Sequence, residues 1–172
     1  MALIRRFPPE HFLRYNEKPV KIKPFSKKQE IIAKKYIARV GEILKDFDLK
    51  IMIRGSTAFK ISGKGDVEIG IYPNESDWKF VTELLRKNFG EPGNVEKDYA
   101  RFNDCCDDIE IEIIILKGKE ARQDILLHEY LIKHPKLLKE YERIKKKYAF
   151  SKREYQIQKN RFLSRVMEKI LS

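Results

Sequence analysis

The chain has 172 residues, of which 42% are hydrophobic and 37% are charged, and its formal net charge is +11. This composition can supply a buried core and is unlike that of a disordered chain, so we expect one domain with a helical appendage. No run of about 18 apolar residues is present, which argues against a membrane-spanning helix.

The positive charge is concentrated near the C-terminus. Residues 127–172 contain 13 lysines and arginines against 5 acidic residues, whereas the other 126 residues contain 24 against 21. A basic surface attracts polyanions such as nucleotides, RNA or acidic membrane surfaces. A lysine-rich helix can also be merely solvated, and both interpretations stay open.

The first elements are an arm, a helix and a strand. Residues 1–25 are proline-rich without a sustained period, which predicts an extended arm. Ser26 and Gln29 have the spacing of a capping box, and apolar residues recur at helical spacing over 27–47. A short apolar strand is predicted at 49–54.

Strands and helices alternate in the next part of the chain. A strand is predicted at 65–72, a helix at 78–90, and a further strand at 95–102. Residues 107–116 alternate strictly, with isoleucines on one face and acidic residues on the other, which predicts a half-buried strand.

The rest of the chain is predicted to be helical, over 121–148 with a break at a His-Pro pair, and over 152–171. This order predicts an α/β (α+β) fold, in which helices flank a small mixed sheet and a helical tail follows. We divide the chain into the arm (1–25), an α/β core (26–118) and a basic helical region packed on the core (119–172).

The only cysteines, Cys105 and Cys106, are adjacent. Adjacent cysteines rarely close a comfortable disulfide, and two thiols without other ligands make a poor zinc site. We therefore expect reduced thiols and a cytoplasmic protein.

The segment "RGSTAFKISGKGDVEIGIY" (54–72) has the order expected of a phosphate and metal site. Gly55-Ser56 follows a strand and begins a tight turn, where free backbone N–H groups and the serine hydroxyl can bind phosphate oxygens. Lys60 and Lys64 could neutralise a polyphosphate.

Two carboxylates follow on the next predicted strand. Asp66 and Glu68 are two residues apart and project from one face, with Cα atoms about 6.5–7 Å apart. They can converge on one hard cation or on two, and Glu110 or Glu112 from the later strand could complete the cage. The alternative is a half-exposed sheet whose polar face is acidic, which alternation alone permits.

Tyr155 and Lys159 are four residues apart and share one face of the predicted last helix. The tyrosine could stack on a base while the lysine contacts a phosphate. Alternatively, Tyr155 packs the tail onto the sheet.

The spacing of these residues resembles a known motif. Gly55-Ser56, nine residues, then Asp66-Val67-Glu68 is similar to the Gly-Ser…Asp-x-Asp/Glu motif of the DNA polymerase β-like nucleotidyltransferase superfamily. There Gly-Ser holds a nucleoside triphosphate, the paired acids hold Mg²⁺, and a third acid comes from a later strand. The resemblance implies one or two Mg²⁺ ions on Asp66, Glu68 and Glu112, with Glu110 as the other candidate.

A second resemblance is to the GrpB-like family within that superfamily. It rests on "GSTA" with a downstream "GK", and on the tail "HEYLIKHPKLLKEYERIKKKYA", which is similar to that family's C-terminal pattern. GrpB-like proteins commonly carry histidines on the later strand, where this chain has Glu110 and Glu112. In this respect the sequence is closer to an active nucleotidyltransferase.

We therefore expect Mg²⁺-dependent transfer of a nucleoside monophosphate from a nucleoside triphosphate to a hydroxyl of a small molecule, RNA or protein. The basic C-terminal helices would bind the acceptor. The alternative is a catalytically weak or inactive fold that binds nucleotide or RNA without turnover. A basic partner-binding or membrane-surface protein is a third, less supported interpretation.

Overall fold

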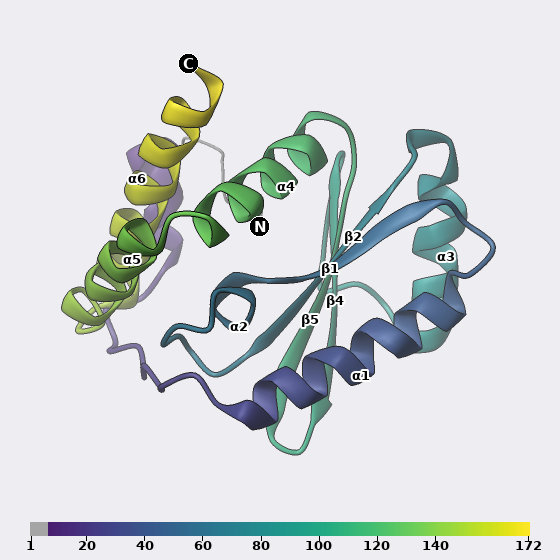
Figure 1. Ribbon diagram of the computed structural model, residues 1–172, viewed down its shortest axis with the longest axis horizontal. Coiled ribbons are helices and arrows are strands. Elements are labelled where there is room, and N and C mark those ends of the chain that lie inside the picture. The colour runs from purple at the N-terminus through teal and green to yellow at the C-terminus, as the bar shows by residue number, and fades with distance from the viewer. Residues whose placement is uncertain (1–6) are drawn as a thin grey trace.

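The computed structural model describes residues 7–172 as a mixed sheet with helices on both faces (Figure 1). The helices are η1 (Pro9–Arg14), α1 (Lys27–Ile43), α2 (Gly55–Phe59), η2 (Glu75–Asp77), α3 (Trp78–Phe89), α4 (Gly118–Ile132), α5 (Pro135–Lys147) and α6 (Lys152–Leu171). The strands are β1 (Leu49–Arg54), β2 (Val67–Pro73), β3 (Asn94–Glu96), β4 (Tyr99–Cys106) and β5 (Ile109–Leu116). The predicted α+β class is confirmed.

The strands are ordered β1-β2-β5-β4-β3. The central pair β2 and β5 is parallel, and the other neighbours are antiparallel. In this register Arg54 lies opposite Glu68, and Glu68 lies opposite Glu112. One row of charged side chains therefore crosses three neighbouring strands on the same face of the sheet.

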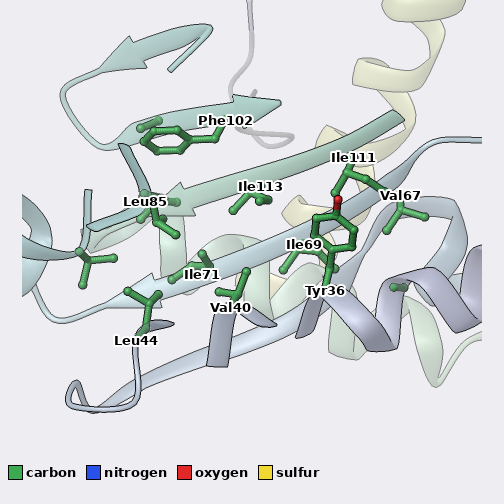
Figure 2. Packing of buried hydrophobic residues seen from close by; sticks show 14 of the residues in the cluster. Tyr36, Val40, Leu44, Val67, Ile69, Ile71, Leu85, Phe102, Ile111 and Ile113 are labelled. Atoms are coloured by element: carbon green, nitrogen blue, oxygen red, sulfur yellow. The ribbon is translucent and has the colours of Figure 1, made fainter. Parts of the chain in front are cut away.

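The opposite face of the sheet packs on α1 and α3 (Figure 2). Alternate residues of the central strands point toward these helices and are fully buried, among them Ile69, Ile71, Ile111 and Ile113. Ser26 caps α1 in the predicted capping box. The acidic alternation of β5 thus leaves its charged residues on the face away from α1.

A second apolar cluster joins the C-terminal helices to the core. Phe59 of α2 packs with α4, α5 and α6, and the rings of Tyr141 and Phe162 stack 5.0 Å apart within this cluster. Figure 1 shows α4 on the side of the sheet opposite α1, with α5 and α6 beyond it. The C-terminal helices therefore pack near the end of β1, where α2 begins.

The described part of the arm is less extended than expected, since Pro9–Arg14 form a 3-10 helix. Its residues 1–6 lie outside the described range. The arm runs beside the C-terminal helices, where the Val20 N–H donates to the Ala149 carbonyl, and it then pairs with the core through Lys23 and Gly63. It therefore links the helical region to the loop before β2.

Some boundaries differ from the predictions. The helix from residue 27 ends at Ile43, and the expected strand at 95–102 is two strands, β3 and β4. Strand β2 begins at Val67, so Asp66 lies in the preceding loop. No helix among residues 7–172 is long and apolar enough to cross a membrane.

Candidate functional site

Six residues that the sequence singled out line one pocket between α2, the loop before β2, and the C-terminal helices. They are Gly55, Ser56, Lys64, Asp66, Glu68 and Lys159. The cavity holds about 30 Å³, which is room for about two water molecules. It can admit an ion or part of a phosphate chain, whereas a nucleoside would have to lie outside it.

The turn at Gly55 requires glycine for two reasons. Its φ of +64° is in the left-handed region, and a Cβ atom there would lie 2.1 Å from the Glu68 carboxylate oxygen. The carboxylate of Glu68 thus packs directly on the start of α2. The Gly55 N–H donates to His128 Nε2 at 3.1 Å, so this backbone donor is already used within the protein.

The loop between α2 and β2 is fixed from several sides. The Asp66 carbonyl accepts hydrogen bonds from Thr57 Oγ1 at 3.2 Å and from Gln29 Nε2 at 3.3 Å. Gly63 lies against Ser56, whose hydroxyl oxygen would be 2.3 Å from a Cβ at residue 63. These contacts hold the carboxylate of Asp66 and the hydroxyl of Ser56 at one pocket.

Helix α5 clamps the same loop at Ser62. The Ser62 N–H donates to Glu142 at 2.8 Å, and its carbonyl accepts from Lys145 Nζ at 2.5 Å. Lys145 is only 3% exposed. Burial and the positive charge of Lys159 lower the pKa of Lys145 to about 7. An anion bound beside these two lysines would relieve their mutual repulsion.

The acidic residues on the sheet strongly affect one another. Burial alone would raise the pKa of Glu68, but the positive charges of Arg54 and Lys159 outweigh it and hold this pKa at about 2. Burial and the negative charge of Glu68 raise the pKa of Glu112. Glu112 is thus the member of the pair that takes up a proton more readily.

Each of the three acids has a basic neighbour. Lys64 Nζ lies 3.3 Å from Asp66, Arg101 lies 3.9 Å from Glu112, and Arg54 lies 4.0 Å from Glu68. In the chain from residue 7 onward, no three His, Cys, Asp or Glu side chains are grouped so that they could hold a metal ion. The charge of the acids is therefore partly neutralised within the protein.

A buried network supports the pocket from below. Arg54 is 1% exposed and binds Asp124 of α4 through two hydrogen bonds of 2.8 and 2.7 Å. Asp124 also accepts from the Tyr72 hydroxyl at 2.5 Å, and its carbonyl accepts from His128 Nδ1 at 2.8 Å. His128 therefore connects this network to the Gly55 turn, as a neutral imidazole whose pKa burial lowers.

The remaining sequence candidates are placed differently. Lys60 is outside the pocket lining and lies 3.6 Å from Glu30. Tyr155 is buried, with Lys159 Nζ 6.0 Å from its ring centre, so its ring is not free to stack on a base. Glu110 is exposed and lines an adjoining hollow together with Asp66.

Four residues at or beneath the pocket were not predicted from the sequence, namely Arg54, Asp124, His128 and Lys145. Asp124 and His128 are four residues apart on a helix, and Arg54 stands directly before Gly55, but nothing in the sequence pairs these segments. Lys145 lies within a basic run and cannot be told from its solvated neighbours by composition.

Comparisons with known proteins agree with this architecture. A family model described as GrpB protein matches residues 19–169. The crystal structure of conserved protein GrpB from Enterococcus faecalis matches with a TM-score of 0.71 at 16% identity, covering 88% of this chain and 97% of that chain. A structure of the Cid1 poly(U) polymerase with magnesium and 3′-dATP matches with a TM-score of 0.51 at 13% identity. That match covers 77% of this chain and 42% of that chain. No curated protein sequence matches. At these identities the similarity shows a shared fold.

Proposed function

This chain belongs to the GrpB family, and we propose that it binds a nucleoside triphosphate with Mg²⁺ and transfers the nucleoside monophosphate to a hydroxyl acceptor. The observation that carries the proposal is the convergence of Ser56, Asp66, Glu68 and Lys159 on one pocket. Ser56, Asp66 and Glu68 come from the continuous segment of α2, the following loop and β2, whereas Lys159 is brought to them from α6 by the docking of the C-terminal helices. The Cid1 structure of the same fold is described as containing magnesium and 3′-dATP, which supports the same ligand class.

The phosphate groups would be bound mainly by side chains. Ser56 supplies a hydroxyl donor, and Lys145 and Lys159 supply ammonium groups from two helices. The Gly55 N–H is engaged by His128, which therefore acts as a positioning residue for the turn. The small cavity would admit part of the phosphate chain, and the rest of the nucleotide would lie outside it.

Carboxylate oxygens suit a hard divalent cation, but the acids of residues 7–172 are not grouped around one, so the site would form only when Asp66 and Glu112 leave Lys64 and Arg101. Asp66 and Glu68 line the pocket, and Glu112 lies opposite Glu68 on the parallel strand, so carboxylate oxygens are available from two segments. These three residues would hold Mg²⁺ once the ion pairs of Lys64 with Asp66 and of Arg101 with Glu112 have broken. When bound, the ion would neutralise negative charge on the phosphates.

A catalytically weak or inactive protein is the second candidate function. The pairing of each acid with a lysine or arginine favours it, because such a site is neutralised without a cation. The basic exposed face of α5, which includes Lys136, Lys139 and Arg143, would then bind RNA or nucleotide. We also propose a cytoplasmic location, because both cysteines are free thiols.

Thermal unfolding with ATP, GTP, CTP or UTP, each with and without Mg²⁺, tests the proposal. At a ligand concentration of about 100 times Kd, binding adds about 2.7 kcal/mol, which raises the Tm of a chain this size by about 5–10 °C. We expect this rise to require both nucleotide and Mg²⁺ and to disappear in Asp66→Asn/Glu68→Gln.

The matched control is Asp46→Asn/Asp48→Asn, which removes two exposed acids at the same spacing after α1. It should respond as the unaltered protein does. Indifference to every nucleotide would refute the proposal. Mg²⁺-dependent binding without pyrophosphate release would favour the inactive alternative.

A further inference from the structure

Two further cavities adjoin the pocket on the side of Asp66. A cavity of about 220 Å³ shares Lys64 and Asp66 with the pocket. A second cavity of about 530 Å³ shares Lys23, Gly65 and Asp108 with the first. We call the two cavities together the arm groove, because the arm forms one of its walls.

The two walls of the arm groove carry opposite charges. Lysines of the arm and of α1 form one wall, namely Lys21, Lys23 and Lys28. Acidic residues at and after the β4–β5 turn form the other wall, namely Asp107, Asp108 and Glu110. Across residues 7–172 no ion pair joins these two sets, and a single hydrogen bond does, from Lys28 Nζ to the Asp107 carbonyl at 3.2 Å. The groove is therefore lined both by lysine ammonium groups and by carboxylates, which come from separate segments of the chain.

Lys23 is fixed at the junction of the two cavities. Its backbone exchanges two hydrogen bonds with Gly63, of 2.7 and 3.0 Å. Its side chain crosses Gly65, where an added Cβ would lie 2.9 Å from Lys23 Cδ and where φ is +88°. The glycine thus leaves room for the lysine stem, and the ammonium group is held over the groove.

We propose that the arm groove is the acceptor subsite and that it takes a hydroxyl compound carrying a phosphate ester. This inference rests on the proposed function. With nucleotide phosphates in the pocket, an acceptor must reach Asp66 from the other side, where the groove begins. Its phosphate ester lies against Lys21 and Lys23, and its reacting hydroxyl lies toward Asp66.

The transfer is balanced without a further reactant. The acceptor oxygen bonds to the α-phosphorus, the bond from that phosphorus to the β-phosphate oxygen breaks, and pyrophosphate leaves. The hydroxyl proton passes to Glu110, which lines the first cavity beside Asp66.

Two sources share this chemistry, namely a small phosphate ester and the 3′ end of an RNA. The probes are ribose 5-phosphate, and a ten-nucleotide RNA with a free 3′-hydroxyl, measured by calorimetry and by fluorescence anisotropy at low salt. We expect Lys21→Met/Lys23→Met to weaken binding of both probes about tenfold, with ATP–Mg²⁺ affinity changed less than twofold. RNA binding at least tenfold tighter than sugar phosphate identifies the RNA end, and equal affinities identify the small ester.

The control is Lys79→Met/Lys87→Met, which removes two exposed charges from α3 on the other face of the sheet. It should leave both probe affinities within twofold. Equal affinities for the groove variant and the control would overturn the inference, as would ATP–Mg²⁺ binding without binding of either probe. Failure to bind ATP–Mg²⁺ at all would instead refute the proposed function, and the acceptor subsite with it.

Discussion

Replacing Asp124 by asparagine tests the network beneath the pocket. Burial alone would raise the pKa of Asp124, but Arg54 and the neighbouring donors hold it at about 2, against an ordinary value of 3.8. That difference corresponds to roughly 2–3 kcal/mol of folding stability. Asp124→Asn removes this contribution and leaves the buried Arg54 guanidinium with only the Glu68 carboxylate as a charged partner, at 4.0 Å. Loss of one partner of a buried ion pair typically costs about 3–5 kcal/mol.

The asparagine oxygen can still accept one hydrogen bond, so we expect a loss of about 3 kcal/mol in the free energy of unfolding at pH 7. Urea denaturation measures it. The control is Glu129→Gln on the same helix, whose 3.0 Å contact with Lys50 is half exposed and should contribute less than about 0.5 kcal/mol.

The pH dependence of the Asp124→Asn effect has a defined sign. The unfolded chain protonates Asp124 near pH 3.8 and the folded chain near pH 2, so its contribution is complete above about pH 5 and is lost progressively as pH falls toward 2. The difference between the two proteins should shrink over that window. A destabilisation below 1 kcal/mol at pH 7, or a difference that persists unchanged to pH 2.5, would refute this reasoning.

Three further predictions concern single side chains. In the folded protein Lys145 has a pKa of about 7, which is below its value in the unfolded chain, so the unfolded chain binds more protons. The free energy of unfolding should therefore rise by about 1 kcal/mol or more between pH 6.5 and pH 9. Urea titrations of Lys145→Met should show a flatter rise. The buried Tyr99 hydroxyl has no hydrogen-bond partner within residues 7–172, so Tyr99→Phe should lower the free energy of unfolding by no more than about 0.5 kcal/mol. Tyr72→Phe loses a hydrogen bond to the buried Asp124 carboxylate and should lower it by about 1.5–3 kcal/mol. Equal losses would contradict this difference in hydrogen bonding. Gly55→Ala should lower the free energy of unfolding by about 1–2 kcal/mol, because residue 55 has a positive φ and contacts Glu68. It should also abolish the rise in Tm that nucleotide and Mg²⁺ cause together. An unchanged rise would contradict the close packing of Gly55 on Glu68.

Local sequence signals predicted the parts of the fold that depend on neighbouring residues. The alternation of residues 107–116 correctly assigned the buried isoleucines and the opposite acidic face of β5, and Ser26 with Gln29 marked the start of α1. The β4–β5 hairpin was missed because its turn uses Asp107 and Asp108 at positive φ instead of the usual glycine.

The site itself was only partly predictable, because strand register and helix docking are not encoded in spacing. Glu112 could not be distinguished from Glu110 until the register set it opposite Glu68. Lys60 has a left-handed φ of 53°, which ends α2, and its ammonium group contacts Glu30 away from the pocket. The buried partners of Arg54 come from a helix 70 residues later in the chain.

The proposed function requires that acidic side chains of two segments bind a divalent cation beside the serine pocket. The most direct test is a crystal structure with Mn²⁺ and a non-hydrolysable ATP analogue, using the anomalous signal of the metal. We expect a manganese peak in direct contact with carboxylate oxygens of Asp66, Glu68 and Glu112, with phosphates at Ser56 and Lys159. Nucleotide bound without manganese there, with Lys64 still on Asp66, would contradict it.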